Sequence, residues 1–133
     1  LVMLDIDHFK KVNDSYGHMV GDEVIRHLAK LIQRHVRETD ISGRYGGEEF
    51  AILLSDTSAE NAKIFAERLR QEVESSVVQY NDIDLKYTIS LGLAEIEPSI
   101  KTYEAWIECA DAALYQSKEN GRNCISHHPK QSN

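Results

Sequence analysis

Two short apolar runs on either side of a glycine pair constrain this fold more than any other stretch of the chain. The runs are residues 41–45 and 50–54, and Gly46-Gly47-Glu48-Glu49 lies between them. Paired glycines between apolar runs are typical of a tight β-hairpin, because glycine adopts backbone conformations that other residues disfavour. The sequence therefore predicts two antiparallel strands joined at this turn.

The other periodic segments place the hairpin within a β-α-β-β-α-β order. Residues 1–6 read as a buried strand, 7–21 as a loop or short irregular helix, and 22–36 as an amphipathic helix. A helix should begin at the capping-box sequence 57–60, and residues 85–93 alternate bulky and small side chains as a strand does. A last helix, capped by Thr102 and stopped at Gly121, leads to a final edge strand over 123–126. This order predicts an α+β fold with a ferredoxin-like βαββαβ core, extended by a C-terminal helix and an edge strand.

The predicted topology brings two carboxylates together. A right-handed crossover from the first strand to the second leaves a slot between them, and the return strand of the hairpin fills it. The end of the first strand, at Asp5, then lies beside the turn that holds Glu48, at what we expect to be a solvent-facing edge of the sheet.

The length and charge of the chain bound its organisation and its partners. The 133 residues suit one domain, which we expect to span residues 1–126, with its N-terminal start missing and a disordered tail over 127–133. The net charge of −7 argues against a nucleic-acid polymer as partner but not against a small nucleotide. No apolar run approaches the roughly 20 residues that a membrane-spanning helix needs.

Several polar residues are of the right type for nucleotide chemistry. Asp5, Glu48 and the main-chain carbonyl of Ile6 could hold Mg²⁺, which proteins bind through one or two carboxylates together with substrate phosphates. Gly46 and Gly47 would let the backbone approach a ligand closely. Taken alone, such carboxylates are more often solvated surface groups than metal ligands, and the glycines fit an ordinary hairpin.

Basic and amide side chains offer the same choice. Lys10, Lys118 and Arg122 could contact phosphates, or could be solvated surface charges. Asn13 and Asp22 carry the groups that match the hydrogen-bonding edge of guanine. The alternatives are a plain loop residue at position 13 and a helix cap at position 22.

The sequence Arg44-Tyr45-Gly46-Gly47-Glu48-Glu49-Phe50 resembles the GGDEF family of diguanylate cyclases in its GGEEF form. Further blocks resemble the family in the same order along the chain: residues 4–14, 16–18, 21–22, 90–94, 110–118 and 121–123. One departure is the absence of the helix with a D-x-L-T-G-L-x-N-R-R pattern with which the family domain normally begins.

The resemblance implies a palm-like fold, as in nucleotidyl cyclases, and assigns a role to each matching residue. The metal ligands would be Asp5, Glu48 and the carbonyl of Ile6, with Glu48 also acting as the base for the 3′-hydroxyl. Substrate contacts would come from Phe9, Lys10, Asn13, His18, Asp22, Gly46, Gly47, Lys118 and Arg122. Arg37 and Asp40 match the RxxD motif of product inhibition, and Arg68 stands where a second arginine of that site is expected. From the residues alone, Arg37 and Asp40 would be a local ion pair at the end of the helix before the hairpin.

The activity implied is the condensation of two GTP into cyclic di-GMP and two pyrophosphates, with Mg²⁺ or Mn²⁺, between two domains that face each other across a two-fold axis. The alternative is a non-catalytic GTP-binding or cyclic di-GMP-binding module of the same fold. The resemblance also implies a homodimer, regulatory domains upstream and a cytoplasmic location, and it leaves open whether the full-length protein is anchored to a membrane.

Overall fold

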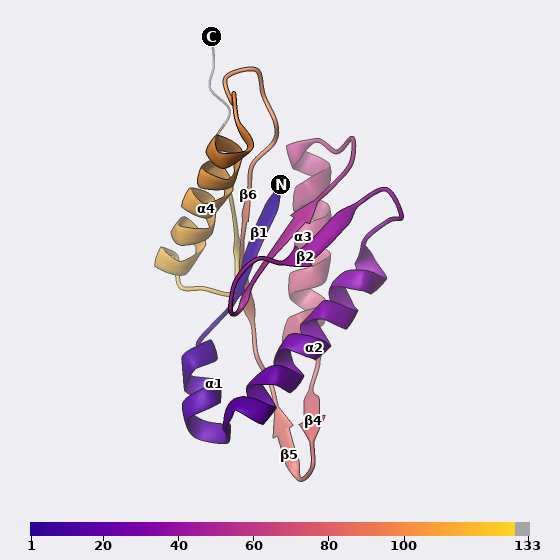
Figure 1. The fold of residues 1–133 in the computed structure, drawn as a ribbon, viewed down its shortest axis with the longest axis vertical. Coiled ribbons are helices and arrows are strands. Elements are labelled where there is room, and N and C mark those ends of the chain that lie inside the picture. The colour runs from indigo at the N-terminus through magenta and orange to yellow at the C-terminus, as the bar shows by residue number, and fades with distance from the viewer. Residues whose placement is uncertain (130–133) are drawn as a thin grey trace.

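Strand β1 (Val2–Ile6) runs through the middle of a five-stranded sheet and is buried along its whole length. The computed structural model describes residues 1–129 (Figure 1). The strand order is β2-β3-β1-β6-β7, with β2 at Ile41–Arg44, β3 at Glu49–Leu53, β6 at Ile89–Leu93 and β7 at Ile125–His127. From β2 through β3 and β1 to β6, each strand is antiparallel to its neighbour, and β7 pairs with β6 in parallel. The ferredoxin-like core, with the return strand of the hairpin next to β1, is therefore confirmed.

Helices cover both faces of the sheet (Figure 1). Side chains alternate across a strand, so Val2, Leu4 and Ile6 pack on one face with α2 (His18–His35) and α3 (Ala59–Ser75). Met3 packs on the other face with Ala110 and Leu114 of α4 (Tyr103–Glu119). The next odd-numbered residue of β1, Asp5, points toward α4 as well.

The structure corrects two of the predicted helix starts and confirms a third. Residues 9–16 form a regular helix, α1 (Phe9–Tyr16), and α2 already begins at His18, because Gly17 adopts a left-handed φ of +91° that ends one helix and caps the next. The cap of α3 is Ser58, whose side chain accepts from the Asn61 N–H; Thr57 instead bonds to the Ser55 carbonyl. Thr102 caps α4 as predicted.

The strand predicted over residues 85–93 is divided. Only Ile89–Leu93 belongs to the main sheet, because β1 ends at Ile6 and leaves the residues before Ile89 without a partner strand. The earlier part is β5 (Ile83–Leu85), which pairs with β4 (Val78–Tyr80) in a separate hairpin that projects from the body (Figure 1). At the C-terminus, β7 includes His127, beyond the predicted domain boundary, and the N–H of His128 donates to the carbonyl of Leu93 at 2.8 Å, so the predicted disorder is wrong for these two residues. Residues 130–133 of the predicted tail lie outside the described residues.

Helix α4 lies directly on β6 because of one glycine. A Cβ atom at Gly92 would stand 2.2 Å from the main-chain nitrogen of Leu114 and 2.3 Å from the carbonyl oxygen of Ala110. Any side chain here would push α4 away from the sheet, and with it every α4 residue that faces β1. The face of the predicted strand that carries the small side chains is thus buried beneath α4.

We expect Gly92→Ala to lower the free energy of unfolding by about 1–3 kcal/mol, the usual cost of overpacking. Gly43→Ala on the edge strand β2 is the matched control, because nothing lies within 4 Å of its added Cβ, and it should change stability by no more than about 0.5 kcal/mol. Urea unfolding of the two variants measures both values. Equal stability would mean that α4 does not need this close approach.

Candidate active site

The side chain of Asp5 occupies a buried position between β1 and α4. The residue is 8% exposed, so the prediction of a solvent-facing carboxylate is wrong. Its Oδ2 accepts a hydrogen bond from Lys118 Nζ at 2.5 Å, and its Oδ1 is buried without a hydrogen-bond partner among the described residues. A buried charge needs a compensating partner, and Lys118 provides one for only one of the two oxygens.

The hairpin brings both of its glutamates to the end of β1. The main-chain N–H of Ile6 donates to the carbonyl of Glu48 at 3.3 Å, so the predicted proximity of the turn to the end of the first strand is confirmed. The residue directly opposite Asp5 in the ladder is Glu49. Glu49 therefore shares the α4 face with Asp5, while Glu48 lies in the turn and is partly exposed.

Glu49 adds a further titratable group, and α4 contributes its partner Asp111. Burial, a hydrogen bond with Asp111 and the negative charges of Asp111 and Asp5 together raise the pKa of Glu49 to about 7, against the opposing charge of Lys118. Neither residue has a predicted role, although both lie in blocks that resemble the family. Only the register of β1 with β3 and the close approach of α4 place them together.

The glycine turn is held by an arginine. The guanidinium of Arg44 donates to the carbonyls of Gly46 (3.1 Å) and Gly47 (2.9 and 2.5 Å), and the N–H groups of Tyr45 and Gly46 donate to the carbonyl of Glu49. Neither glycine has a φ in the left-handed region, and an added Cβ would meet nothing closer than 4.0 Å. The turn therefore does not need glycine for its own conformation. The alternative that Gly46 and Gly47 are present because a tight hairpin requires them is not supported.

Asn13 lies against Gly21, the residue before Asp22, where α1 packs on α2. A Cβ at Gly21 would stand 2.0 Å from Asn13 Oδ1 and 3.2 Å from the tip of the Phe9 ring, so these side chains cover the helix beside Asp22. Asn13 Oδ1 is buried without a partner in the described part of the chain. Asp22 is exposed and lies inside α2, whose N-cap is Gly17, so the alternative that Asp22 caps the helix is wrong.

The remaining predicted substrate residues line the ends of neighbouring helices. Lys10 lies in the first turn of α1 and His18 is the first residue of α2; both are exposed. Arg122 follows α4 with a φ of +65°, and its N–H donates to the carbonyl of Ser117.

Asp7, to which the sequence analysis gave no role, fixes this end of α4. It is buried and accepts from Thr88 Oγ1 (2.7 Å), Ser90 Oγ (2.6 Å) and the main-chain N–H of Asn123 (3.0 Å). These bonds attach the turn after α4, which carries Arg122, to the end of β1. Its three donors lie far along the chain from residue 7, so no local sequence signal could have shown this network.

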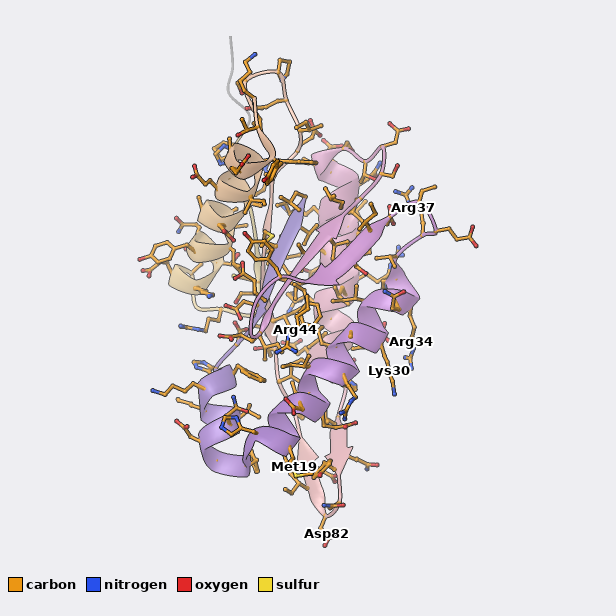
Figure 2. The ribbon with its side chains drawn as sticks, viewed as in Figure 1. Met19, Lys30, Arg34, Arg37, Arg44 and Asp82 are labelled. Carbon is orange, nitrogen blue, oxygen red and sulfur yellow. The ribbon has the colours of Figure 1, made fainter. Side chains whose placement is uncertain are left out.

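Arg37 and Asp40 form an ion pair in the turn after α2, not on the helix itself, which ends at His35. Arg37 also donates to the Ser55 carbonyl (2.7 Å) and Thr57 Oγ1 (2.9 Å), and its pairing lowers the pKa of the Asp40 carboxyl although burial opposes the shift. Arg37 lies at the end of α2 away from Arg44 and the glycine turn (Figure 2). Arg68 is exposed on α3, and no hydrogen bond or ion pair within residues 1–129 joins it to this pair.

The carboxylates fit a metal site that is completed by substrate. No group of three or more His, Cys, Asp or Glu side chains within residues 1–129 is arranged to hold a metal by itself. A Mg²⁺ site built from two carboxylates, a carbonyl and phosphates needs no such group. The unpartnered Oδ1 of Asp5 is the kind of buried acceptor that a cation would satisfy.

Within residues 1–129, no helix has both the length and the apolar character required to cross a bilayer.

Comparison with known proteins gives consistent matches over nearly the whole chain. Residues 1–124 match the model of the family described as "Diguanylate cyclase, GGDEF domain". Diguanylate cyclase A of Treponema denticola is 43% identical over 126 residues, which are 95% of this chain and 34% of that protein. The response regulator PleD of Caulobacter vibrioides is 41% identical over 126 residues, 93% of this chain and 28% of that protein. The chain thus spans about a third of the length of these curated relatives.

Solved structures agree with the sequence matches. The GGDEF domain of DgcB from Caulobacter crescentus, in complex with c-di-GMP, superposes with a TM-score of 0.90 at 40% identity and covers 96% of this chain and 75% of that chain. The active GGEEF domain of a diguanylate cyclase from Vibrio cholerae superposes with a TM-score of 0.89 at 34% identity and covers 98% and 82%.

The raised pKa of Glu49 predicts how stability depends on pH in metal-free protein. The fold favours the protonated carboxyl, so this contribution is present below pH 4.5 and is lost as the pH rises toward about 7. Glu49→Gln keeps a hydrogen-bond donor to Asp111 without a titrating proton. In EDTA, urea unfolding between about pH 5 and pH 8 should show a smaller loss of stability for the variant than for the wild type. Parallel curves would mean that Glu49 is ionised throughout this range.

Proposed function

The chain belongs to the GGDEF domain family of diguanylate cyclases, and on this premise we propose that it condenses two molecules of GTP into one cyclic di-GMP and two pyrophosphates. The observation that carries the proposal is Asp5. It is a buried carboxylate with one oxygen that has no partner within residues 1–129, and it lies near the end of the central strand β1, beside the GGEEF turn.

GGDEF diguanylate cyclases are metal-dependent, and we assign Mg²⁺ or Mn²⁺ to the carboxylates of Asp5 and Glu48 and the carbonyl of Ile6. These are hard oxygen ligands, the type that both ions prefer. Divalent ions at this position neutralise the triphosphate and stabilise the charge that develops in the in-line displacement.

The phosphates would lie between the glycine turn and the ends of α1 and α4. Glycine at 46 and 47 is not required by the turn itself, so a bare backbone at this place is explained by close contact with a ligand. Lys118 and Arg122 would contact the phosphates from the end of α4, and the segment of Phe9 and Lys10 would do so from the start of α1.

The guanine base of GTP would be recognised where α1 contacts α2. The exposed carboxylate of Asp22 can accept from N1–H and N2–H₂ of guanine, donors that adenine does not present at the same edge. Asn13 brings an amide whose oxygen has no partner within the domain. His18, one turn before Asp22 on the same helix, would flank the nucleotide.

Condensation of two GTP molecules requires two domains. One domain offers one set of these residues and therefore holds one GTP, so each 3′-hydroxyl must attack the α-phosphate of the GTP bound by the opposite domain. Glu48 would accept the proton of the hydroxyl, each new P–O bond replaces the bond to pyrophosphate, and two pyrophosphates leave. A homodimer is accordingly part of the proposal, together with upstream regulatory domains and a cytoplasmic location.

Product would inhibit at a separate site formed by Arg37, Asp40 and Arg68. Arginine binds phosphate and stacks on guanine, and Asp40 is a hydrogen-bond acceptor for the guanine edge. Arg68 lies on α3 and makes no hydrogen bond or ion pair with Arg37 within residues 1–129. A ligand bound by Arg37, Asp40 and Arg68 would therefore link two domains, or connect α3 with the turn after α2 in one domain. Occupancy that favours a non-productive arrangement of the domains is allosteric inhibition.

The activity is tested by incubating the chain with GTP and Mg²⁺ over a range of protein concentrations and quantifying cyclic di-GMP. The rate per domain should rise with concentration, because two domains share each turnover. Asp5→Asn or Glu48→Gln should lower it by about a hundredfold or more. Asp84→Asn, an exposed carboxylate on β5, is the control. GTP binding without any product at every concentration would indicate a binding module instead.

The inhibitory site is best tested at Arg68, because Arg37 also holds the loop at Ser55 and Thr57 and its removal would disturb that loop. Arg68→Ala loses no hydrogen bond or ion pair within the described residues. We expect the concentration of cyclic di-GMP needed for half-inhibition to rise about tenfold or more, with the uninhibited rate unchanged. Lys63→Ala, on the same helix, controls for loss of charge. Equal inhibition of the Arg68 and Lys63 variants would contradict the assignment.

A further inference from the structure

Lys118 makes a contact that its proposed role toward phosphates does not explain. Its ammonium group donates to Asp5 Oδ2 at 2.5 Å and is the only hydrogen-bond donor to that carboxylate within residues 1–129. The Asp5 side chain is 11% exposed, whereas the Lys118 side chain is 33% exposed. The pair therefore joins a buried anion to a cation that still reaches solvent.

The backbone around Lys118 is fixed, so only its side chain can move. The preceding residue, Ser117, is fully buried, and its hydroxyl bonds to the Leu91 carbonyl (2.7 Å) and to Ser126 Oγ (2.9 Å). The carbonyl of Ser117 accepts from the Arg122 N–H at 3.0 Å. The last turn of α4 is thus attached to both β6 and β7, and the long stem of Lys118 is the mobile part.

A divalent cation on Asp5 would compete with this ammonium group. Both positive charges would lie within a few ångströms of the same buried carboxylate, where solvent screens their repulsion poorly. Asp5 supplies only one negative charge, which is too little to balance both an ammonium group and a divalent ion. The lysine must therefore leave Asp5, and it can do so at little cost only if another anion receives it.

We propose that Lys118 is a stand-in cation: it neutralises Asp5 while no metal is bound, and it moves to the phosphates of the incoming nucleotide when the metal takes its place. The inference rests on the proposed function, which supplies both the metal and the phosphates. Its consequence is that metal binds weakly to the empty domain and strongly only together with nucleotide. The two ligands are then coupled through one side chain.

The test measures binding of Mn²⁺ without nucleotide, from the electron paramagnetic resonance signal of the free ion. Lys118→Met removes the charge and keeps the stem, and it should bind Mn²⁺ at least about tenfold more tightly than the wild type. Lys118→Arg keeps a cation and should bind as weakly as the wild type. Lys30→Met, which removes an exposed charge from α2 (Figure 2), should behave like the wild type.

Thermal unfolding provides a second readout. In EDTA, Lys118→Met leaves a buried carboxylate without a partner and should melt at a lower temperature than the wild type, and Mn²⁺ should restore more of its stability than it adds to the wild type. If the methionine variant does not fold, Lys118→Gln, which keeps a neutral donor to Asp5, replaces it with the same expectation.

Asp5→Asn separates this inference from the proposed function. Binding of Mn²⁺ that depends on Asp5 and is tightened in Lys118→Met supports the stand-in cation. Binding that depends on Asp5 but is equal in the wild type and Lys118→Met overturns the stand-in and leaves the metal site intact. Binding that persists in Asp5→Asn overturns both.

Discussion

A carboxylate on a strand that is buried on both faces is costly, and the compensation of Asp5 determines how the rest of the site is arranged. Lys118 can reach Asp5 only because α4 lies against β6, and α4 lies there only because Gly92 has no side chain. Burial and the neighbouring carboxylates raise the pKa of Glu49, which lies opposite Asp5 in the ladder, to about 7. The packing of one helix on the sheet thus sets the electrostatics of the site.

Asp5 and Asp7 illustrate how two similar residues separate into a functional and a structural role. Both lie at the end of β1. Asp7 accepts from two hydroxyls and one main-chain N–H, so its charge is satisfied by fixed neutral donors and it serves to hold the turn after α4. Asp5 has one ionic partner with a flexible stem, and its other oxygen has no partner within residues 1–129. A carboxylate of the second kind is available to a cation, and the first kind is not.

The sequence predicted what depends on local chemistry and connectivity. The hairpin, the βαββαβ order and the meeting of Asp5 with the GGEEF turn follow from glycine, side-chain periodicity and the handedness of crossovers. Contacts between distant segments could not be predicted: the register that sets Glu49 opposite Asp5, the pairing of Glu49 with Asp111, and the network of Asp7. The start of α2 was missed because Gly17 read as part of a loop, although its positive φ joins two helices without a gap.

The central claim, that Asp5 holds the metal of a GTP-condensing site, is tested most directly by anomalous diffraction from crystals grown with Mn²⁺ and a non-hydrolysable GTP analogue. We expect a manganese peak at coordination distance from a carboxylate oxygen of Asp5, with the Lys118 ammonium moved from Asp5 to a phosphate oxygen. Manganese bound to the phosphates alone, with Lys118 still on Asp5, would contradict it.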